Sequence, residues 1–398
     1  MIGRRDLPGR TSAMPDDVPA SHRPRASLLE VAVLFLRLGF TAFGGPAAHI
    51  AIMESEVVRR RRWLSSERFL DLLGAANLIP GPSSTELAIF IGYEEAGWLG
   101  LVLGGFCFIL PAAATVTVLA WAYVRFGKIP EIAGVLYSIK PVVIAVVVQA
   151  LSGLAPKAIK KSLWLGAIGV IACAAAALQV DPIVVLVGGG LASVLLGRLE
   201  KAGGQASALW FAGFTGATAT MVAPVSLPTL FLFFFKTGAL VFGSGYVLLA
   251  FLRADLVDRL HWLTEAQLLD AIAIGQVTPG PVFTTATFIG YVVAGGWGAA
   301  LATLGIFLPG FLLVAVTRPL IVRVRRSPLA GAFLDGVNVA ALALMTVVTV
   351  KLAYSALVDV PTVLLALVSA TAIIRFRVNT TWVVAGAAVV GAAVRAFR

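Results

Sequence analysis

Two stretches of this sequence are too long and too apolar for a water-soluble fold. Residues 98–124 and 292–317 contain no Asp, Glu, Lys or Arg, and each exceeds the roughly 20 residues that cross a hydrocarbon core about 30 Å thick. The whole chain is 59% hydrophobic and 13% charged, which is more apolar side chain than a soluble core can hide. Because backbone in lipid must satisfy its own hydrogen bonds and the alternating pattern of a barrel is absent, the sequence predicts an all-α polytopic membrane protein.

The formal net charge of +11 does not indicate nucleic-acid binding. The Arg and Lys residues lie in short loops between apolar segments, where they set orientation in a bilayer, and not in a stripe interleaved with aromatic residues. Cys107 and Cys173 are far apart and the three histidines are scattered, so we expect no metal site and no cofactor. Residues 1–27 are rich in Pro, Arg and Asp and read as a flexible tail, not as a signal peptide.

A shift of 199 positions aligns the chain with itself. Arg37 falls on Lys236, and Pro80-Gly81-Pro82 falls on Pro279-Gly280-Pro281. Chance similarity between apolar helices would match Leu and Val, not Gly, Pro and charged residues, so the alignment indicates an internal duplication. The predicted organisation is a tail at 1–27, a first transmembrane repeat at 28–200, a linker at 201–227 and a second transmembrane repeat at 228–398.

The charges of equivalent loops indicate that the two repeats are inverted. The loop 59–68 carries five Arg and one Glu, whereas its counterpart 253–265 carries two Arg and three acids. Further along, the bias reverses: 318–326 carries four Arg and no acid, and its counterpart 125–131 is nearly balanced. Under the positive-inside rule, opposite biases in equivalent loops are what an inverted repeat predicts.

The same loops predict how the Pro-Gly-Pro segments lie in the membrane. Within each half, loops of opposite bias can be separated by only one full crossing, so 69–95 and 268–295 are expected to enter and return as re-entrant hairpins. Proline on both sides of glycine interrupts a helical hydrogen-bond ladder, and such backbone is tolerated at membrane depth only where it is buried or lines a cavity. The predicted architecture is an inverted repeat with about ten crossings plus two hairpins.

The broken segments predict a substrate site. In each half a glycine-rich break in the first helix is followed by a Pro-Gly-Pro break flanked by amide and hydroxyl residues, and paired interruptions of this kind mark the binding site of many transporters. Half-helices that start after Pro82 and Pro281 would present free N–H groups and positive dipole ends, which suit an anion. Our candidate substrate-binding residues are Arg37, Gly44, Gly45, Asn77, Pro80, Gly81, Pro82, Ser83, Thr85, Lys236, Gly243, Ser244, Gln276, Pro279, Gly280, Pro281 and Thr284.

Three charged residues near these breaks carry separate hypotheses. Arg37 and Lys236 are equivalent cations inside the apolar first helices of the two halves. They either bind the anionic substrate or extend their charged ends to a nearby membrane interface. Glu86, whose counterpart is Thr285, is a candidate for proton coupling or an ordinary acid at a helix N-terminus. With no nucleophile and base in evident partnership and no phosphate-binding loop, the sequence does not indicate an enzyme or an ATP-driven pump.

Three motifs resemble those of the chromate ion transporter family, in its long two-domain form. They are Phe-Gly-Gly-Pro at 43–46, Asn-Leu-Ile-Pro-Gly-Pro at 77–82 and Gly-Gln-Val-Thr-Pro-Gly-Pro at 275–281. The second half departs from the first motif with Gly243-Ser244-Gly245, which leaves the symmetry of the two sites open.

The resemblance implies a multi-pass protein of the bacterial inner membrane that exports chromate, driven by the proton-motive force. Sulfate or another oxyanion as substrate, and a passive anion channel in place of a carrier, remain open. The expected partners are the oxyanion and the lipid bilayer, and the sequence permits a homodimer. It also leaves open the side of the tail and whether 205–225 crosses the membrane.

Overall fold

The computed structural model describes residues 25–43, 45–127, 129–159, 162–201, 225–242, 245–317 and 327–396. These residues are mostly helical and contain no strand. The first half contains α1 (Leu28–Thr41), α2 (Gly45–Glu54), η2 (Ser55–Arg60), α3 (Ser66–Ala76), α4 (Ser83–Phe126), α5 (Pro130–Ile159), α6 (Leu163–Ala177) and α7 (Pro182–Lys201). The second half contains α8 (Leu227–Leu240), η3 (Gly245–Val247), α9 (Leu248–Leu252), η4 (Arg253–Arg259), α10 (Glu265–Val277), η5 (Val282–Thr284), α11 (Thr285–Thr317), α13 (Pro328–Ala356), α14 (Val360–Ile374) and α15 (Thr380–Ala396).

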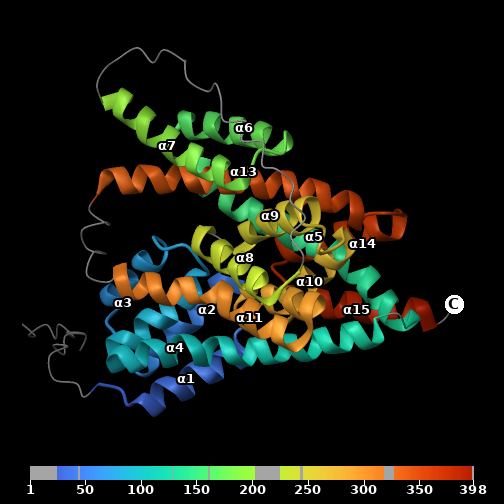
Figure 1. The fold of residues 1–398 in the computed structure, drawn as a ribbon, viewed down its shortest axis with the longest axis horizontal. Helices are drawn as coiled ribbons and strands as arrows, with labels where there is room; N and C mark the ends of the chain where they lie inside the picture. Colours follow the sequence, from blue (N-terminus) through green and yellow to red (C-terminus); the bar gives the residue numbers. More distant parts are fainter. Residues whose placement is uncertain are drawn as a thin grey trace, which may run out of the picture.

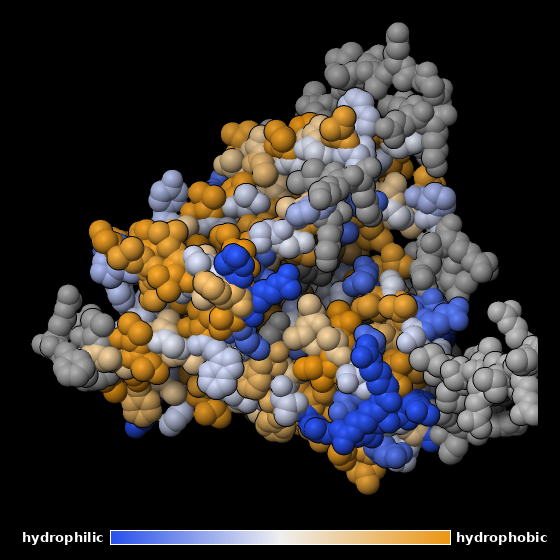
Figure 2. All heavy atoms as spheres, turned by 180° about the vertical axis from the view of Figure 1, so that it is seen from behind, coloured by the Kyte–Doolittle hydropathy of each residue, from blue (hydrophilic) through white to orange (hydrophobic). Residues whose placement is uncertain are grey.

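The surface of these helices is that of a membrane protein. Large apolar side chains point outward, among them Leu163 at 94%, Val170 at 72% and Trp297 at 76% exposure, and Figure 2 shows wide hydrophobic areas with hydrophilic residues gathered in patches. In water such a surface would be costly, whereas lipid covers it without penalty. Four segments of the described chain are long and apolar enough to cross a bilayer: Ser83–Phe126, Gly134–Pro156, Val282–Thr317 and Pro328–Ala356.

The duplication extends to the details of the backbone. η2 and η4 are both π-helical and occupy matching places after the first helix of each half. A sharp break interrupts α4 at Ala96 (φ −135°, ψ 19°) and Gly97 (φ 64°, ψ −148°), and the same break recurs in α11 at Ala294 (φ −143°, ψ 23°) and Gly295 (φ 65°, ψ −155°). Two copies of one ancestral repeat explain this agreement, because nothing local would force the same four angles twice. The predicted fold class and its two homologous halves are confirmed.

Each of these breaks folds the chain back on itself. A Cβ atom placed on Gly92 would lie 2.1 Å from the carbonyl oxygen of Gly100, and one on Gly290 would lie 2.3 Å from that of Gly298. Backbones that approach so closely leave no room for a side chain, which is the role of small residues between membrane helices. The segment before each break therefore packs antiparallel against the segment after it.

The Pro-Gly-Pro tips join two short helical arms in each half. α3 has 11 residues, a length of about 16 Å at 1.5 Å per residue, and the arm 83–95 is of similar length. Neither arm reaches the roughly 30 Å of a hydrocarbon core. These lengths fit the predicted hairpins, while re-entry itself and the number of crossings stay predictions.

The two halves exchange their last helices. α14 and α15 of the second half pack against α5 of the first, and α6 and α7 of the first half pack against α13 of the second. At the centre α4 packs against α11, with α1 on the outer side of α4 and α8 beside α11. Figure 1 shows α1 and α4 along one side of the molecule, α6, α7 and α13 along the other, and α8, α10 and α11 between them. The sequence repeats are therefore interlocked in space.

Single cysteines test the inverted orientation of the repeats. In a chain with Cys107→Ala and Cys173→Ala, we expect Arg60→Cys and Arg323→Cys to react with a membrane-impermeant maleimide from the same face of the membrane, because both loops are strongly basic and the positive-inside rule puts both on the inner side when the repeats are inverted. Labelling is measured in right-side-out and inverted vesicles. Reaction of the two cysteines from different faces would contradict the inversion.

Candidate functional site

The first helix of each half ends at a break that frees one carbonyl group. α1 ends before Ala42 (φ −83°, ψ 94°) and α8 ends before Val241 (φ −78°, ψ 106°). Both residues are extended, so their carbonyl oxygens leave the helical ladder and need other donors. Of the predicted residues in these breaks, Gly45 begins α2 with φ +78°, and Gly44, Gly243 and Ser244 lie outside the described residues.

These carbonyls are taken up by the Pro-Gly-Pro tip of the opposite half. The N–H of Gly81 donates to the oxygen of Val241 at 2.8 Å, and the N–H of Gly280 donates to the oxygen of Ala42 at 2.9 Å. Gly81 has φ +128° and Gly280 has φ +89°, conformations that glycine adopts without a steric penalty. We call this pair of bonds the crossed clasp. It joins the predicted breaks of both halves at one place.

Just beyond the clasp, two half-helices begin. In the first half-helix, the first N–H group with an acceptor is that of Thr85, which donates to the oxygen of Pro82 at 2.6 Å. In the second it is that of Thr284, which donates to the oxygen of Pro281 at 3.0 Å. The preceding N–H groups have no acceptor within the helix and carry its positive partial charge. The hydroxyl of Thr284 returns to the oxygen of Pro281 at 2.8 Å. Backbone donors at both tips are therefore available to an anion.

Unpaired polar atoms gather on the two hairpins. In the described part of the chain, the buried atoms without a hydrogen-bond partner include Thr85 Oγ1, both carboxyl oxygens of Glu86 and Gln276 Nε2. Buried polar groups are nearly always paired, so a cluster of exceptions marks a place where a ligand can supply the partner. Asn77 is exposed at the end of α3, Pro80 and Ser83 are half-buried, and Pro82, Pro279 and Pro281 are buried.

Glu86 makes the two tips different. Its side chain is 0% exposed, and a Cβ atom on Gly81 or on Gly310 would lie 2.2 or 2.8 Å from its Oε1. At the equivalent place of the second half, a Cβ atom on Gly280 would lie 2.6 Å from the methyl group of Ala112. The first tip therefore packs around a carboxyl group where the second packs around a methyl group.

The structure pairs Arg37 and Lys236 with acidic side chains. Arg37 Nη1 lies 3.9 Å from Glu56 Oε1, and Lys236 Nζ lies 4.0 Å from Asp255 Oδ2. The two acids belong to η2 and η4, and Arg259 also pairs with Asp255 at 3.0 Å. Glu56 and Asp255 are 199 positions apart like the cations, so the repeat alignment held a signal for these pairs. A role for the cations in substrate binding stays a prediction.

His49 is a buried member of the clasp that the sequence did not reveal. Its Nε2 lies 3.0 Å from the oxygen of Ala42 and its Nδ1 lies 3.3 Å from Ser84 Oγ. Because a carbonyl accepts only, Nε2 carries the proton and Nδ1 accepts from the hydroxyl. Ala42 thus receives two donors, His49 and Gly280. No sequence signal pointed to this link, since its partners are a backbone carbonyl and a hydroxyl on another helix.

A buried ion pair ties the first half to the second hairpin. Lys140 Nζ of α5 lies 3.1 Å from Asp270 Oδ1 of α10, and Tyr123 of α4 donates its hydroxyl to Asp270 Oδ2 at 3.0 Å. Asp270 is 4% exposed. Beyond the tips the alignment of the two halves slips by one residue, to a shift of 198, and the residue equivalent to Lys140 is Asn338. The pair therefore has no charged copy, and the repeat gave no signal for it.

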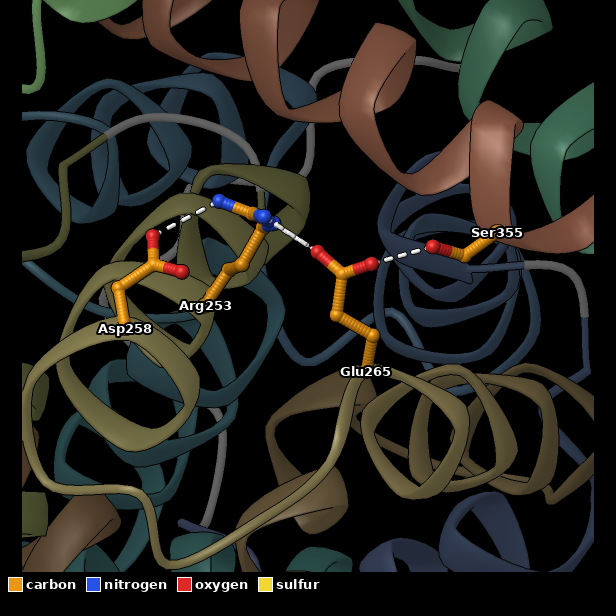
Figure 3. Close-up of polar contacts among 4 residues, drawn as sticks. All are labelled: Arg253, Asp258, Glu265 and Ser355. Atoms are coloured by element: carbon orange, nitrogen blue, oxygen red, sulfur yellow. Dashed lines mark hydrogen bonds and ion pairs between the residues drawn. The ribbon is translucent and has the colours of Figure 1, made fainter.

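A second charged network closes the end of the same hairpin (Figure 3). Arg253 donates to Asp258 at 2.8 Å and through Nε to Glu265 at 2.8 Å, and the hydroxyl of Ser355 donates to the same Glu265. The network joins η4, α10 and α13. In the first half the residue equivalent to Arg253 is Glu54 and the residue equivalent to Asp258 is Arg59. These two also pair, with the charges exchanged, since Arg59 donates to Glu54 at 3.0 Å. The spacing of five residues matches one turn of a π-helix.

Two helical repeats, broken helices that cross at the centre, and unpaired polar groups at that crossing define a polytopic membrane transporter with internal repeats. Within the described residues, no cluster of three His, Cys, Asp or Glu side chains could hold a metal ion.

The family follows from sequence comparison. The sequence model of the chromate transporter family matches residues 29–194 and 228–392, and the chain belongs to this family. A chromate transport protein of Cupriavidus metallidurans is 36% identical over 376 residues, 92% of this chain and 93% of that protein. A chromate transport protein of Pseudomonas aeruginosa is 33% identical over 86% of this chain and 84% of that protein. A probable chromate transport protein of Synechococcus elongatus is 33% identical over 87% of this chain and 90% of that protein. No solved structure matches the chain.

The need for glycine at position 280 of the clasp can be tested by adding one methyl group. We expect Gly280→Ala to lower stability by about 1–2 kcal/mol for the left-handed backbone and by about 1–3 kcal/mol more for overpacking against Ala112. Gly295→Ala is the matched control, because its φ is +65° but its Cβ atom would meet nothing within 4 Å. The measurement is thermal unfolding in detergent. Equal losses in the two variants would show that the contact with Ala112 is unimportant.

The buried ion pair makes a different prediction. Lys140→Met leaves Asp270 buried without its cation, and we expect a loss of about 3–5 kcal/mol. Arg59→Met breaks an ion pair whose side chains are 75% and 37% exposed, and we expect about 0–1 kcal/mol. The double exchange Lys140→Asp with Asp270→Lys should recover part of the loss. Thermal unfolding of the four purified proteins decides, and equal stability of Lys140→Met and Arg59→Met would refute the assignment.

Proposed function

We propose that this protein exports chromate across the bacterial inner membrane as a secondary transporter driven by the proton-motive force. The observation that carries the substrate is the 36% identity over 92% of the chain to a chromate transport protein. Chromate is a tetrahedral dianion, and the crossing of the tips offers the two kinds of group that bind such anions, namely helix N-terminal N–H donors and uncharged side-chain donors.

The proposed site lies at the crossed clasp. Thr85 Oγ1 and Gln276 Nε2, both buried and unpaired, supply a hydroxyl donor from one hairpin and an amide donor from the other. Asn77 and Ser83 stand at the first tip, and the N–H groups ahead of Thr284 stand at the second. The site is built within one chain, from both repeats, and rocking of the repeats about it would expose it to either side of the membrane in turn.

Arg37 and Lys236 are proposed to act at a distance from the tips. Each lies about one turn before the freed carbonyl of its first helix and is held by an acid of a π-helical segment. From there a cation raises the local concentration of an approaching anion and lowers its barrier to entry. Their partial exposure, 56% and 41% of the side chains, leaves them accessible to an anion.

Purified protein in liposomes tests the function. We expect labelled chromate inside these liposomes to leave faster than from liposomes without protein. An interior-negative membrane potential should make this efflux faster still. Labelled sulfate, a dianion of similar shape, is the competing substrate. Transport of sulfate but not of chromate would replace the proposed substrate, and a linear, non-saturating chromate flux would favour a channel.

The role of the two cations has its own test. We expect Arg37→Ala and Lys236→Ala to reduce chromate efflux several-fold, and Arg37→Lys to retain most of it, because the charge is what attracts the anion. Efflux is measured at low ionic strength and again at high salt. Salt screens the attraction between cation and anion, so the difference in efflux rate between wild type and alanine variants should become smaller at high salt. Wild-type rates in both alanine variants, at equal amounts of protein in the membrane, would remove these residues from the transport path.

A further inference from the structure

We propose that Glu86 carries one proton in the same direction as the oxyanion, so that a dianion crosses together with one proton and the loaded site moves a net charge of −1. The inference rests on the proposed function and deepens it by naming the proton site and the sign of the coupling. It starts from geometry: a carboxyl group enclosed at the tip of the first hairpin.

The enclosure of Glu86 decides its charge in this conformation. The side chain is 0% exposed and neither oxygen has a hydrogen-bond partner in the described part of the chain. Its Oε1 lies against the backbone of Gly81 and of Gly310, neither of which brings a charge. Burying an ionised carboxylate without a cation or donors is far more costly than burying the neutral acid. The closed arrangement of the tips therefore contains the protonated form.

The charged and titratable groups on the neighbouring elements are engaged elsewhere or lie on other parts of those elements. His49 of α2 bonds Ala42 and Ser84, Arg37 of α1 pairs with Glu56, and Asp270 of α10 pairs with Lys140. The remaining ones on α1, α2, α3, α10 and α11 are Glu30, Glu54, Glu67, Arg68, Asp71, Glu265 and Tyr291, and those on α4 itself are Tyr93, Glu94, Glu95, Cys107, Tyr123 and Arg125. None of them forms an ion pair or hydrogen bond with Glu86 among the described contacts.

The position of Glu86 couples it to the anion. It follows the unpaired hydroxyl of Thr85 directly and touches Gly81 of the tip, so it lies beside the proposed binding groups. A carboxylate there would repel a dianion and would compete with it for the free N–H groups, whereas the neutral acid has an O–H to donate. Protonation and anion binding therefore favour each other, and by linkage each raises the affinity for the other.

The second tip has no such group. At the place equivalent to Glu86 stands Thr285, whose hydroxyl is already satisfied by the oxygen of Val282 at 2.8 Å, and Ala112 fills the space that Gly310 leaves open in the other half. One proton site thus serves two tips. A dianion with one proton retains a charge of −1. The membrane potential, which is the electrical part of the proton-motive force, drives this charge outward, and it does so although the proton moves against its own gradient.

The sign of proton movement tests the proposal. Full-length protein is placed in liposomes that contain chromate and a trapped pH dye, in alkaline buffer where chromate is a dianion, with potassium and valinomycin to hold the membrane potential. We expect the lumen to become more alkaline as chromate leaves, because each anion takes one proton with it. Acidification of the lumen, or chromate efflux with no change of lumen pH, would overturn the proposal. Absence of any chromate flux would instead refute the proposed function.

Variants assign the proton to Glu86. Glu86→Gln keeps the shape of the neutral acid but has no proton to release. We expect its net chromate efflux to leave lumen pH unchanged, and we expect exchange of labelled for unlabelled chromate, which needs no net proton movement, to persist. Glu86→Asp should retain the alkaline shift, and Glu67→Gln, the same substitution at an exposed acid, should behave as wild type. A Glu86→Gln protein with wild-type thermal unfolding that has lost exchange, or that still shifts lumen pH, would exclude Glu86 as the proton carrier.

Discussion

The structure depends on how its broken helices satisfy their backbone. In lipid an unpaired carbonyl or N–H group costs several kcal/mol, yet both first helices stop at Ala42 and Val241 and both hairpins turn at a glycine. The crossed clasp solves the two problems together, since the freed carbonyl of each half receives the freed N–H of the other. Each break therefore supplies a hydrogen-bond partner that the other break needs.

The clasp also explains why polar atoms can collect at the centre of an apolar molecule. Once the tips are fixed against the opposite breaks, the half-helices that start there have fixed directions, and so do their free N–H groups. His49 adds a second donor to one of the two carbonyls, so the two ends of the clasp differ in their hydrogen bonds. A symmetric scaffold thus carries two different tips, with Glu86 at one and Thr285 at the other.

Much of this arrangement could be predicted from the sequence, because the chain contains an internal repeat. A shift of 199 residues located the breaks, the tips and the pairing of Arg37 with Lys236, because features that recur at one spacing stand out from apolar background. The sequence could not show which break meets which tip, since the crossed connection joins residues far apart along the chain. His49 and Lys140 were missed for a related reason: neither has a copy in the other half, and their partners lie on distant helices.

The exchange of the last helices between the halves has a consequence for biosynthesis. α5 packs against α14 and α15, which leave the ribosome about 200 residues later, a delay of roughly 10–40 seconds at ordinary rates of synthesis. During that time α14 and α15 are not there to cover its contact face, and for the first part of it the buried Lys140 has no Asp270. The first half therefore enters the membrane unfinished, and the native packing of both halves is reached only after the last helix has been made.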